Sequence, residues 1–311
     1  MSFPDPHHPF DPPIDEVRAR IDWRDLKLPE GHPGSPDAIE KILANKPQHW
    51  LDWYQGRFQN PEGGPTSFSP ASLSHDQVRE MNAMIHVENE LIDDACGRVM
   101  DWLKRTGADE NTDIFYTSDH GELQGDLGLM FKGPYHVESL LRIPMLWRPA
   151  PSSCADPLEI SEPVGHVDLA PTFCRIAGVE IPEHMQGEPL PDDEASTRER
   201  VITTFDSQFR QVGMHLRTIF RDGFLCTIYE PRSYNRGGAF RLYWSVWGKD
   251  SLPPTYSGNE GELYDVENDP HQWHNLWDSP KHRSLRDDLI ADLRDHLPKV
   301  REPALAVEAP T

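Results

Sequence analysis

Cysteine, long apolar runs and basic residues are all scarce in this sequence of 311 residues. The four cysteines form no C-x-x-C pair, so we expect free thiols in a reducing compartment rather than a disulfide framework. No apolar run approaches the ~20 residues of a membrane helix. The opening stretch MSFPDPHHPFDPP lacks the charged and apolar regions of a signal peptide. These absences predict a cytoplasmic protein without a membrane partner.

Acidic residues outnumber basic ones by 52 to 30, which gives a formal net charge of −22. This balance argues against nucleic acid as a partner, because phosphate binding requires a basic face. The same charge repels small anions at long range. An anionic substrate would therefore need a locally basic site, made by a metal ion or by a cluster of Lys, Arg and His side chains.

Proline and glycine are abundant, with 30 and 21 residues, and predict long, stiffened loops. Prolines crowd the first 36 residues, so no long element is expected there, and a helix is expected near Ile39–Arg57, where aromatic residues recur at helical spacing. The clearest helix begins after Ser74, which forms a capping box with Gln77. Its apolar stripe has a period near 3.6 and ends at Gly107.

A short apolar run at residues 114–116 follows this helix and predicts a buried β-strand, which is typical of an α/β fold. Asp119 and His120 come directly after the run, where open α/β sheets carry their chemistry. The segment 140–149 is expected to form the next strand. A short helix is expected over Leu169–Ala177, with Gly178 ending it.

The composition changes near residue 200. Five short segments rich in β-branched and aromatic residues begin at positions 201, 215, 224, 240 and 261, and turn residues separate them. They predict a small antiparallel sheet. A helix is expected over Ser284–Leu297, followed by a loose tail. The sequence thus predicts two domains, an α/β domain over residues 1–200 and a small α+β subdomain over residues 201–311.

Four segments resemble motifs of the sulfatase family (arylsulfatase and phosphonate monoester hydrolase-like proteins), within the alkaline-phosphatase-like superfamily. A P-H-x-P loop of the family is similar to FPDPHHPFDPP at residues 3–13. The second half of its catalytic domain is similar to YTSDHGELQGDLGLMFKGPYHVESLLRIPMLW at 116–147 and GHVDLAPTFCRIAGVEIPEHMQGEPL at 165–190. Its L-Y-D-x-x-x-D-P-x-x-x-x-N-L segment is similar to GELYDVENDPHQWHNL at 261–276. Their order along the chain strengthens the resemblance.

The resemblance implies a partial alkaline-phosphatase-like α/β sandwich with a small C-terminal antiparallel sheet plus helix. It implies metal-dependent hydrolysis of a sulfate monoester, with a small anionic ester as substrate and a cysteine-derived formylglycine as nucleophile. On these positions Asp119 and His120 would be metal ligands. Lys132 would contact a substrate oxygen, and His7 would do likewise or donate the proton to the leaving group. Glu122 and Asp126 are expected to fix the loop.

The sequence departs from the family in its N-terminal half. None of the four cysteines lies in the C-x-P-S-R or C-x-A-S-R pattern, and no acidic pair follows an N-terminal apolar strand. This sequence is expected to begin where the family pattern is roughly two-fifths through. We therefore expect a C-terminal part of a sulfatase-like protein that holds half of the metal site, exposes apolar sheet edge and is inactive alone.

Two alternatives stay open. Related enzymes on the same scaffold cleave phosphodiesters or phosphonate monoesters, so the ester hydrolysed could be one of these. The other alternative is a non-catalytic remnant of a sulfatase. For the metal, an Asp-His pair favours Mn²⁺, Zn²⁺ or Fe²⁺ over Ca²⁺, because imidazole suits those ions better.

Overall fold

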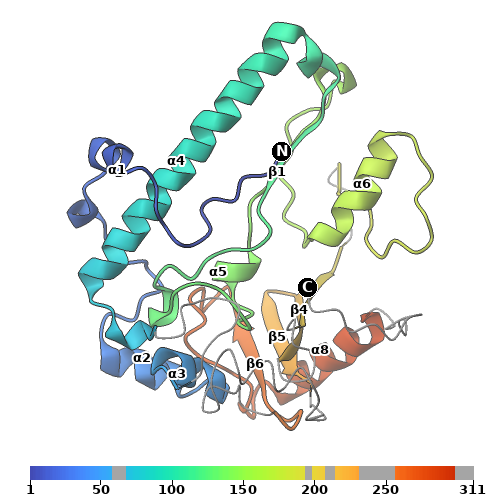
Figure 1. Cartoon of the computed structure of the whole chain (residues 1–311). Helices are drawn as coiled ribbons and strands as arrows, with labels where there is room; N and C mark the ends of the chain where they lie inside the picture. Colours follow the sequence, from blue (N-terminus) through green and yellow to red (C-terminus); the bar gives the residue numbers. More distant parts are fainter. Residues whose placement is uncertain (58–67, 193–197, 207–213, 231–255, 298–311) are drawn as a thin grey trace, which may run out of the picture. The chain divides into compact units, whose positions relative to one another are not determined.

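The computed structural model describes residues 1–57, 68–192, 198–206, 214–230 and 256–297. The chain forms two compact units (Figure 1). The first contains Met1–Lys41 and Asp52–Asp156, and the second contains Ile42–Leu51 and Pro157–Thr311. The four-stranded sheet begins at Arg200, next to the predicted domain boundary, but the predicted two-domain division itself stays a prediction. Within the described ranges, every helix is too short or too polar to cross a lipid bilayer.

The first unit is mainly helical and holds a two-stranded sheet. Its elements are α1 (Ile14–Arg20), α4 (His75–Thr106), β1 (Ile114–Thr117), α5 (Glu138–Leu141) and β2 (Met145–Arg148), with short 3-10 turns at Trp23–Asp25, Pro70–Ser72, Ala108–Asn111, Asp126–Gly128 and Pro151–Ser153. The helices α2 (Pro36–Leu43) and α3 (Gln48–Tyr54) each divide their residues between the two units.

Helix α4 begins and ends as predicted. The Ser74 hydroxyl accepts the backbone N–H of Gln77 at 3.2 Å, and the Gln77 side chain accepts the Ser74 N–H at 2.9 Å. These two bonds satisfy donors that a helix start leaves open. At the other end, Gly107 takes a left-handed conformation, with φ of 71°, which favours glycine.

The single helix expected over Ile39–Arg57 is wrong, because the structure has α2 and α3 in its place. Pro47 explains the break. It has no N–H to continue the hydrogen bonding of α2, and its ring disfavours helical backbone at the preceding Lys46. Helix α3 then begins directly after Pro47, and the N–H of Trp50 donates to the Pro47 carbonyl at 3.1 Å.

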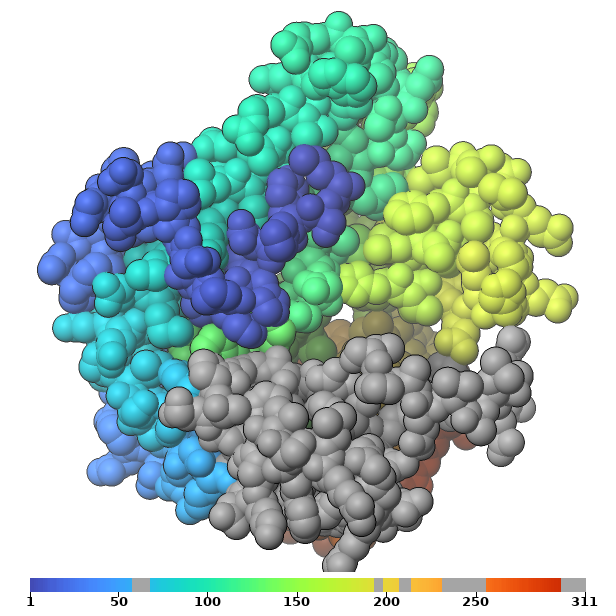
Figure 2. Space-filling view, in the orientation of Figure 1, coloured from blue at the N-terminus to red at the C-terminus, as the bar shows by residue number. Residues whose placement is uncertain are grey.

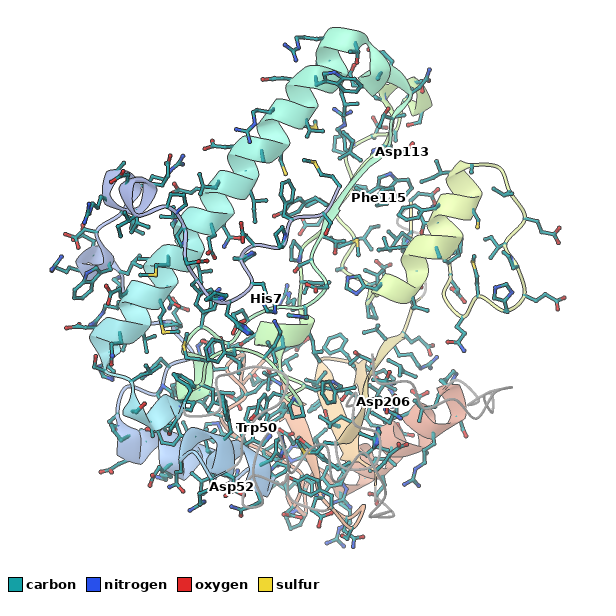
Figure 3. All side chains as sticks on the ribbon, in the orientation of Figure 1. His7, Trp50, Asp52, Asp113, Phe115 and Asp206 are labelled. Carbon is teal, nitrogen blue, oxygen red and sulfur yellow. The ribbon has the colours of Figure 1, made fainter. Side chains whose placement is uncertain are left out.

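Strands β1 and β2 pair antiparallel and place apolar side chains on both faces. On one face Phe115, labelled in Figure 3, stacks on Trp147 with ring centroids 5.2 Å apart. On the other face Tyr116 and Leu146 lie directly opposite each other and are 44% and 63% exposed. The strand over residues 114–116 is therefore not buried as predicted. The expected exposure of an apolar sheet edge is a different feature and stays a prediction.

The second predicted strand is shorter than the segment 140–149, because α5 takes up residues 138–141 and β2 begins only at Met145. Pro144 accounts for this start. It has no N–H to donate to the ladder, so the pairing with β1 begins at the residue after it.

The second unit is built on a four-stranded antiparallel sheet in the order β3-β4-β5-β6. Its elements are β3 (Arg200–Asp206), β4 (His215–Arg221), β5 (Phe224–Tyr229), β6 (Gly261–Asp265), α6 (Leu169–Ile176) and α8 (Arg283–His296), with a 3-10 turn at His166–Asp168. The antiparallel sheet, the short helix before Gly178 and the C-terminal helix are confirmed. The segment predicted as a strand from residue 240 and the tail after residue 297 lie outside the described residues.

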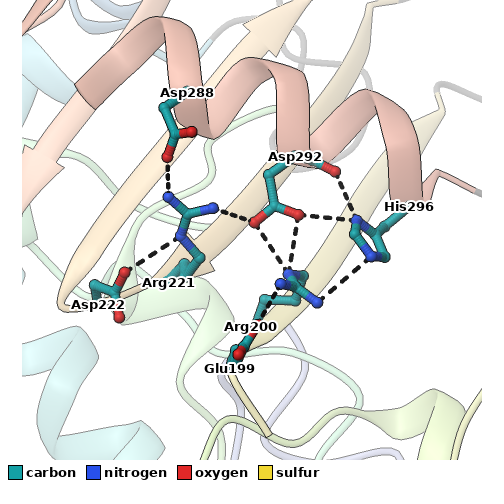
Figure 4. A network of polar contacts seen from close by, with 7 residues as sticks. All are labelled: Glu199, Arg200, Arg221, Asp222, Asp288, Asp292 and His296. Carbon is teal, nitrogen blue, oxygen red and sulfur yellow. Dashed lines mark hydrogen bonds and ion pairs between the residues drawn. The ribbon is translucent and has the colours of Figure 1, made fainter. Parts of the chain in front are cut away.

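Helix α8 is fastened to the sheet by an ion network around Asp292 (Figure 4). This carboxylate accepts hydrogen bonds from Arg200 of β3 at 3.0 Å and from Arg221 of β4, and His296 lies 2.8 Å away. Burial acts to raise the pKa of Asp292, but the bonds from the two arginines outweigh it, and the pKa lies below its ordinary value. Beneath the network, Leu289 and Leu293 join the apolar core against the sheet.

A buried polar cluster ties residues 42–51 to the strands β5 and β6. The ammonium of Lys46 donates to the hydroxyl of Tyr264 at 2.5 Å and to the carbonyl of Gln272 at 2.7 Å. Tyr264 and Tyr229 both donate to the carboxylate of Glu262, which is fully buried. Burial of Lys46 lowers its pKa to about 8, with Glu262 acting against that shift. Tyr264 therefore bridges a buried cation and a buried carboxylate.

This bridge predicts a difference between two conservative changes. Tyr264→Phe removes the hydroxyl that serves both Lys46 and Glu262, so we expect the free energy of unfolding to fall by ~1–3 kcal/mol or more. Tyr229→Phe removes one donor to Glu262 alone and should cost less. Urea unfolding monitored by tryptophan fluorescence measures both. An equal cost for the two variants would contradict the bridging role.

Candidate active site

Asp119 and His120 follow the carboxyl end of β1, as predicted from their place after the apolar run. Oδ1 of Asp119 accepts the backbone N–H of His120 at 3.0 Å and the hydroxyl of Ser118 at 3.4 Å. Its Oδ2 stands 3.7 Å from Nε2 of His120, and the Asp119 side chain is 85% exposed. A carboxylate oxygen and an imidazole nitrogen thus lie next to each other at the surface of the first unit.

The ring of His120 is oriented by its other nitrogen. Nδ1 lies 2.8 Å from the carbonyl oxygen of Gly121. Because a carbonyl oxygen only accepts hydrogen bonds, we assign the proton to Nδ1, which leaves the lone pair on Nε2 beside Asp119. A backbone carbonyl that fixes the tautomer in this way is typical of metal-binding histidines.

Asp119 carries the negative charge that a cation ligand needs. Burial acts to raise its pKa, but the neighbouring His120 and hydrogen bonds from backbone N–H groups and Ser118 together lower the pKa below its ordinary value. Asp119 is therefore an anion at neutral pH.

Gly121 sets the position of this pair. Its N–H donates to the carbonyl of Leu140 at 2.9 Å, and a β-carbon added at Gly121 would stand 1.9 Å from the carbonyl oxygen of Ser139. No side chain fits between the loop and α5. The sequence Asp-His-Gly therefore needs its glycine for close backbone contact.

The loop after Gly121 is folded on itself. The N–H of Leu123 donates to the carbonyl of Phe131 at 3.1 Å, and Ser139 donates to the carboxylate of Asp126 at 2.5 Å. The prediction that Asp126 fixes the loop is confirmed. The side chains that the loop buries are Leu123, Leu127, Leu129, Met130 and Phe131.

The N-terminal segment that carries His7 meets this loop through aromatic rings. Phe131 lies 6.0 Å from Phe10 and 5.1 Å from His8, measured between ring centroids. Phe68 approaches the same ring at 5.2 Å. Residues from two distant parts of the sequence therefore pack around Phe131, which directly precedes Lys132.

His7 lies on this segment and is labelled in Figure 3. Its ring centroid is 4.2 Å from that of His8, and its Nδ1 is 2.6 Å from the His8 carbonyl oxygen. The pKa of His8 is lowered to about 4, first by burial and then by the positive charges of His7 and Lys132. Lys132 and His7 therefore both act on His8, which stays neutral near pH 7.

Glu122 lies near the same lysine. Burial raises the pKa of Glu122 to about 7, while the charge of Lys132 acts to lower it. One of its carboxyl oxygens, Oε1, is buried and has no hydrogen-bond partner among the described residues. Glu122 also directly follows the Asp119–Gly121 turn in sequence.

The structure thus places Asp119 beside His120, and both His7 and Lys132 near His8. That all four serve one substrate stays a prediction. The sequence predicts only a loop-fixing role for Glu122, and His8 is not among the predicted site residues. Both residues lie within segments that resemble family motifs, and this was the one sequence feature that pointed to them. That they are buried near Lys132 could not be deduced from the motifs.

A divalent cation would find two donors of suitable chemistry in Asp119 and His120. Among the residues described, no group of three or more His, Cys, Asp and Glu side chains could hold a metal ion. Mg²⁺ and Ca²⁺ take six or more ligands, and Zn²⁺ takes four. The pair fits part of a metal site, and further ligands would have to come from water, substrate or other protein residues.

Comparisons with known proteins agree with these motifs. Residues 49–179 match the family model described as Sulfatase. The uncharacterized sulfatase YidJ of Escherichia coli (strain K12) is 28% identical over 309 residues, which cover 97% of this chain and 51% of that protein. The multifunctional alkaline phosphatase superfamily protein PehA of Trinickia caryophylli is 28% identical over 262 residues, 81% of this chain and 46% of that protein.

The fold is also similar to that of solved structures. The phosphonate monoester hydrolase of Agrobacterium radiobacter superposes with a TM-score of 0.69 at 20% sequence identity, over 95% of this chain and 56% of that chain. The chain thus resembles the sulfatase family in the sequence of residues 49–179 and in its fold. The resemblance and the alkaline-phosphatase-like fold class predicted from the sequence are therefore confirmed. The chain spans about half the length of the curated relatives it matches.

The close contact between Gly121 and α5 predicts that one added methyl group at this position lowers the stability of the fold. Gly121→Ala should displace the loop from α5, because the methyl would overlap the Ser139 carbonyl, and we expect unfolding to become easier by ~1–3 kcal/mol. The matched control is Gly97→Ala in α4, where no atom lies within 4 Å of the added carbon. That change should be neutral or stabilising by up to ~1 kcal/mol. Thermal unfolding of both variants checks the pair, and a neutral Gly121→Ala would contradict the close contact.

Proposed function

We propose that the chain carries part of the active site of a metal-dependent sulfate monoester hydrolase. The observation that supports this most is the pairing of an ionised carboxylate, Asp119, with an imidazole, His120, whose tautomer is set by the Gly121 carbonyl. This is the donor chemistry of a metal ligand pair. It follows β1 directly, within the stretch of the chain that matches the sulfatase family.

Two cationic side chains, Lys132 and His7, would bind the oxygens of the sulfate ester. Lys132 would contact the non-bridging oxygens of a sulfate group, where negative charge increases in the transition state. His7 would do the same, or donate a proton to the leaving oxygen as the S–O bond breaks. His8 stays neutral, so the positive charge of the cluster is that of Lys132 and His7. The cluster supplies local positive charge in a chain of net charge −22.

The metal held by Asp119 and His120 would supply charge for the bound oxyanion. Mn²⁺, Zn²⁺ and Fe²⁺ are favoured over Ca²⁺, since one of the two donors is imidazole. The small anionic ester remains the proposed partner, and neither nucleic acid nor a membrane is proposed.

The same site would also suit a phosphodiester or a phosphonate monoester, because these share the oxyanion and the leaving oxygen with a sulfate ester. The fold similarity to a phosphonate monoester hydrolase favours this second candidate at the level of scaffold. A non-catalytic remnant of a sulfatase remains the third candidate.

The metal prediction can be tested on the chain itself. Titration with Mn²⁺, followed by the loss of free-ion signal in electron paramagnetic resonance, should show one weak site. Asp119→Ala and His120→Ala should each weaken binding by about tenfold or more, because each removes one of the two protein donors. Ca²⁺ should compete poorly with Mn²⁺ and Zn²⁺ for this site.

The control is His86→Ala. His86 is an exposed histidine of the same unit, and its Nε2 lies 3.8 Å from the carboxylate of Glu90. The substitution therefore removes an imidazole that lies beside a carboxylate on α4, outside the proposed site. It should leave Mn²⁺ binding unchanged. Equal loss of binding in His86→Ala and His120→Ala, or tight Ca²⁺ binding that excludes Mn²⁺, would contradict the proposed site.

The 311-residue chain alone should show no turnover above background. None of its four cysteines lies in the formylglycine pattern. Burial raises the pKa of the Cys226 thiol to about 12, which makes it unreactive. Loss of a covalent nucleophile that acts together with a metal typically costs on the order of 10⁴–10⁶ in rate.

The assay uses an aryl sulfate and an aryl phosphodiester with the purified chain and added Mn²⁺, Zn²⁺ or Ca²⁺. Turnover that Asp119→Ala abolishes would refute the inactivity of the chain and would show that a nucleophile exists within it. Background rates with every metal, identical for the chain and for Asp119→Ala, are the expected result.

A further inference from the structure

The N-terminal segment that bears His7 is fastened to α4 by polar contacts of two kinds. Figure 2 shows this segment, in dark blue, lying along the side of α4. The first contact is made by Arg20 at the end of α1, which binds Glu16 at 3.0 Å and, on α4, Glu90 at 3.1 Å and Asp94 at 2.9 Å. At this contact the carboxylates of α4 have a cation beside them, which compensates part of their negative charge.

The second contact is made by Glu88 of α4 and has no cation. Glu88 is only 3% exposed, and its Oε1 accepts the backbone N–H of Asp11 at 3.1 Å. Its Oε2 is buried and has no hydrogen-bond partner among the described residues. The charged groups that act on Glu88 are Asp5 and Asp11, both on the N-terminal segment and both acidic.

A buried carboxylate without a counter-charge is unfavourable, and a proton relieves it. Burial, with the charges of Asp5 and Asp11, raises the pKa of Glu88 to about 7, while the bond from Asp11 N–H opposes that shift. The protonated acid still accepts that bond and carries no charge toward the two aspartates. The ionised acid repels both of them.

We propose that Glu88 is a positioning residue, which holds the His7-bearing segment against α4 when its carboxyl group is protonated and releases it in part when the group ionises. The significance of this for catalysis rests on the proposed function of His7. The pH-dependent part of the attachment involves Glu88, Asp5 and Asp11 and does not involve His7.

The direction of the effect follows from linkage. The folded pKa of Glu88 lies above the ordinary value of 4.5, so the attached state binds the proton more tightly than the detached state. The attachment is therefore strongest below about pH 4.5, and it weakens as the pH rises toward 7 and stays weak above that. Arg20 keeps its charge throughout this range, so the contact at α1 remains.

The test is the exchange of the Asp11 backbone amide with solvent, measured by NMR on the whole chain at pH 5.5 and pH 8.5. Protection is corrected for the intrinsic dependence of exchange on pH. In the natural sequence we expect protection to fall by about tenfold or more between the two values, which corresponds to a pKa difference of at least about one unit. In Glu88→Gln, which keeps an acceptor and cannot ionise, protection should be independent of pH.

The matched control is Glu90→Gln, two residues further along α4, where the carboxylate pairs with Arg20. It should keep the pH dependence of the natural sequence. Exchange of the amides of Ile85 and Ile92, buried in the same helix, reports whether each variant is folded.

Equal protection of Asp11 at the two pH values in the natural sequence would overturn the proposal, even if Glu88→Gln failed to fold. The same pH dependence in a folded Glu88→Gln variant would also overturn it. The experiment uses neither metal nor substrate, so its outcome is separate from that of the proposed hydrolase function. Loss of Mn²⁺ binding in Asp119→Ala would not alter it.

Discussion

The close contact of the Gly121 backbone with α5 is the constraint on which the candidate site depends. The loop donates to Leu140 and leaves no space for a β-carbon beside the Ser139 carbonyl. The same Gly121 offers its own carbonyl to the ring of His120. One glycine therefore sets both the place of the loop and the direction of Nε2. Asp119 then follows by chain geometry, since its carboxylate is held by the N–H of the next residue.

The net negative charge of the chain explains why cationic side chains are needed near the candidate site. The chain is strongly acidic, and an anionic ester is repelled until it reaches a local cation. His7 and Lys132 come from segments more than a hundred residues apart, and the rings around Phe131 bring their backbones together. His8 is held neutral by burial between the two. The aromatic cluster thus has an electrostatic consequence as well as an apolar one.

The sequence predicted those helix ends that are fixed by hydrogen bonds between neighbouring residues. Ser74 with Gln77, and Gly107, mark the ends of α4 because capping needs only neighbouring residues. Asp119 and His120 were found because they follow an apolar run. Prediction was wrong where proline competed with periodicity, at Pro47 and before Met145.

Features that depend on distant contacts could not be predicted. Lysine is usually found at protein surfaces. Lys46 is nevertheless buried against Tyr264, which lies more than two hundred positions away in the sequence. Glu88 of α4 is only 3% exposed and accepts the N–H of Asp11, a contact with a segment 77 positions away that no local signal in the sequence indicates. The exposed pair Tyr116 and Leu146 is the converse case, since an apolar run predicts burial but cannot say what covers it.

Paramagnetic relaxation by Mn²⁺ tests most directly whether the site is a single one. With the chain isotopically labelled and Mn²⁺ added below stoichiometry, signals close to the ion broaden steeply with decreasing distance. We predict that His7 and Lys132 broaden together with Asp119 and His120, because groups that share one metal-bound oxyanion lie within ~15 Å of the ion. Asp119 and His120 signals that broaden while those of His7 stay sharp would contradict the account.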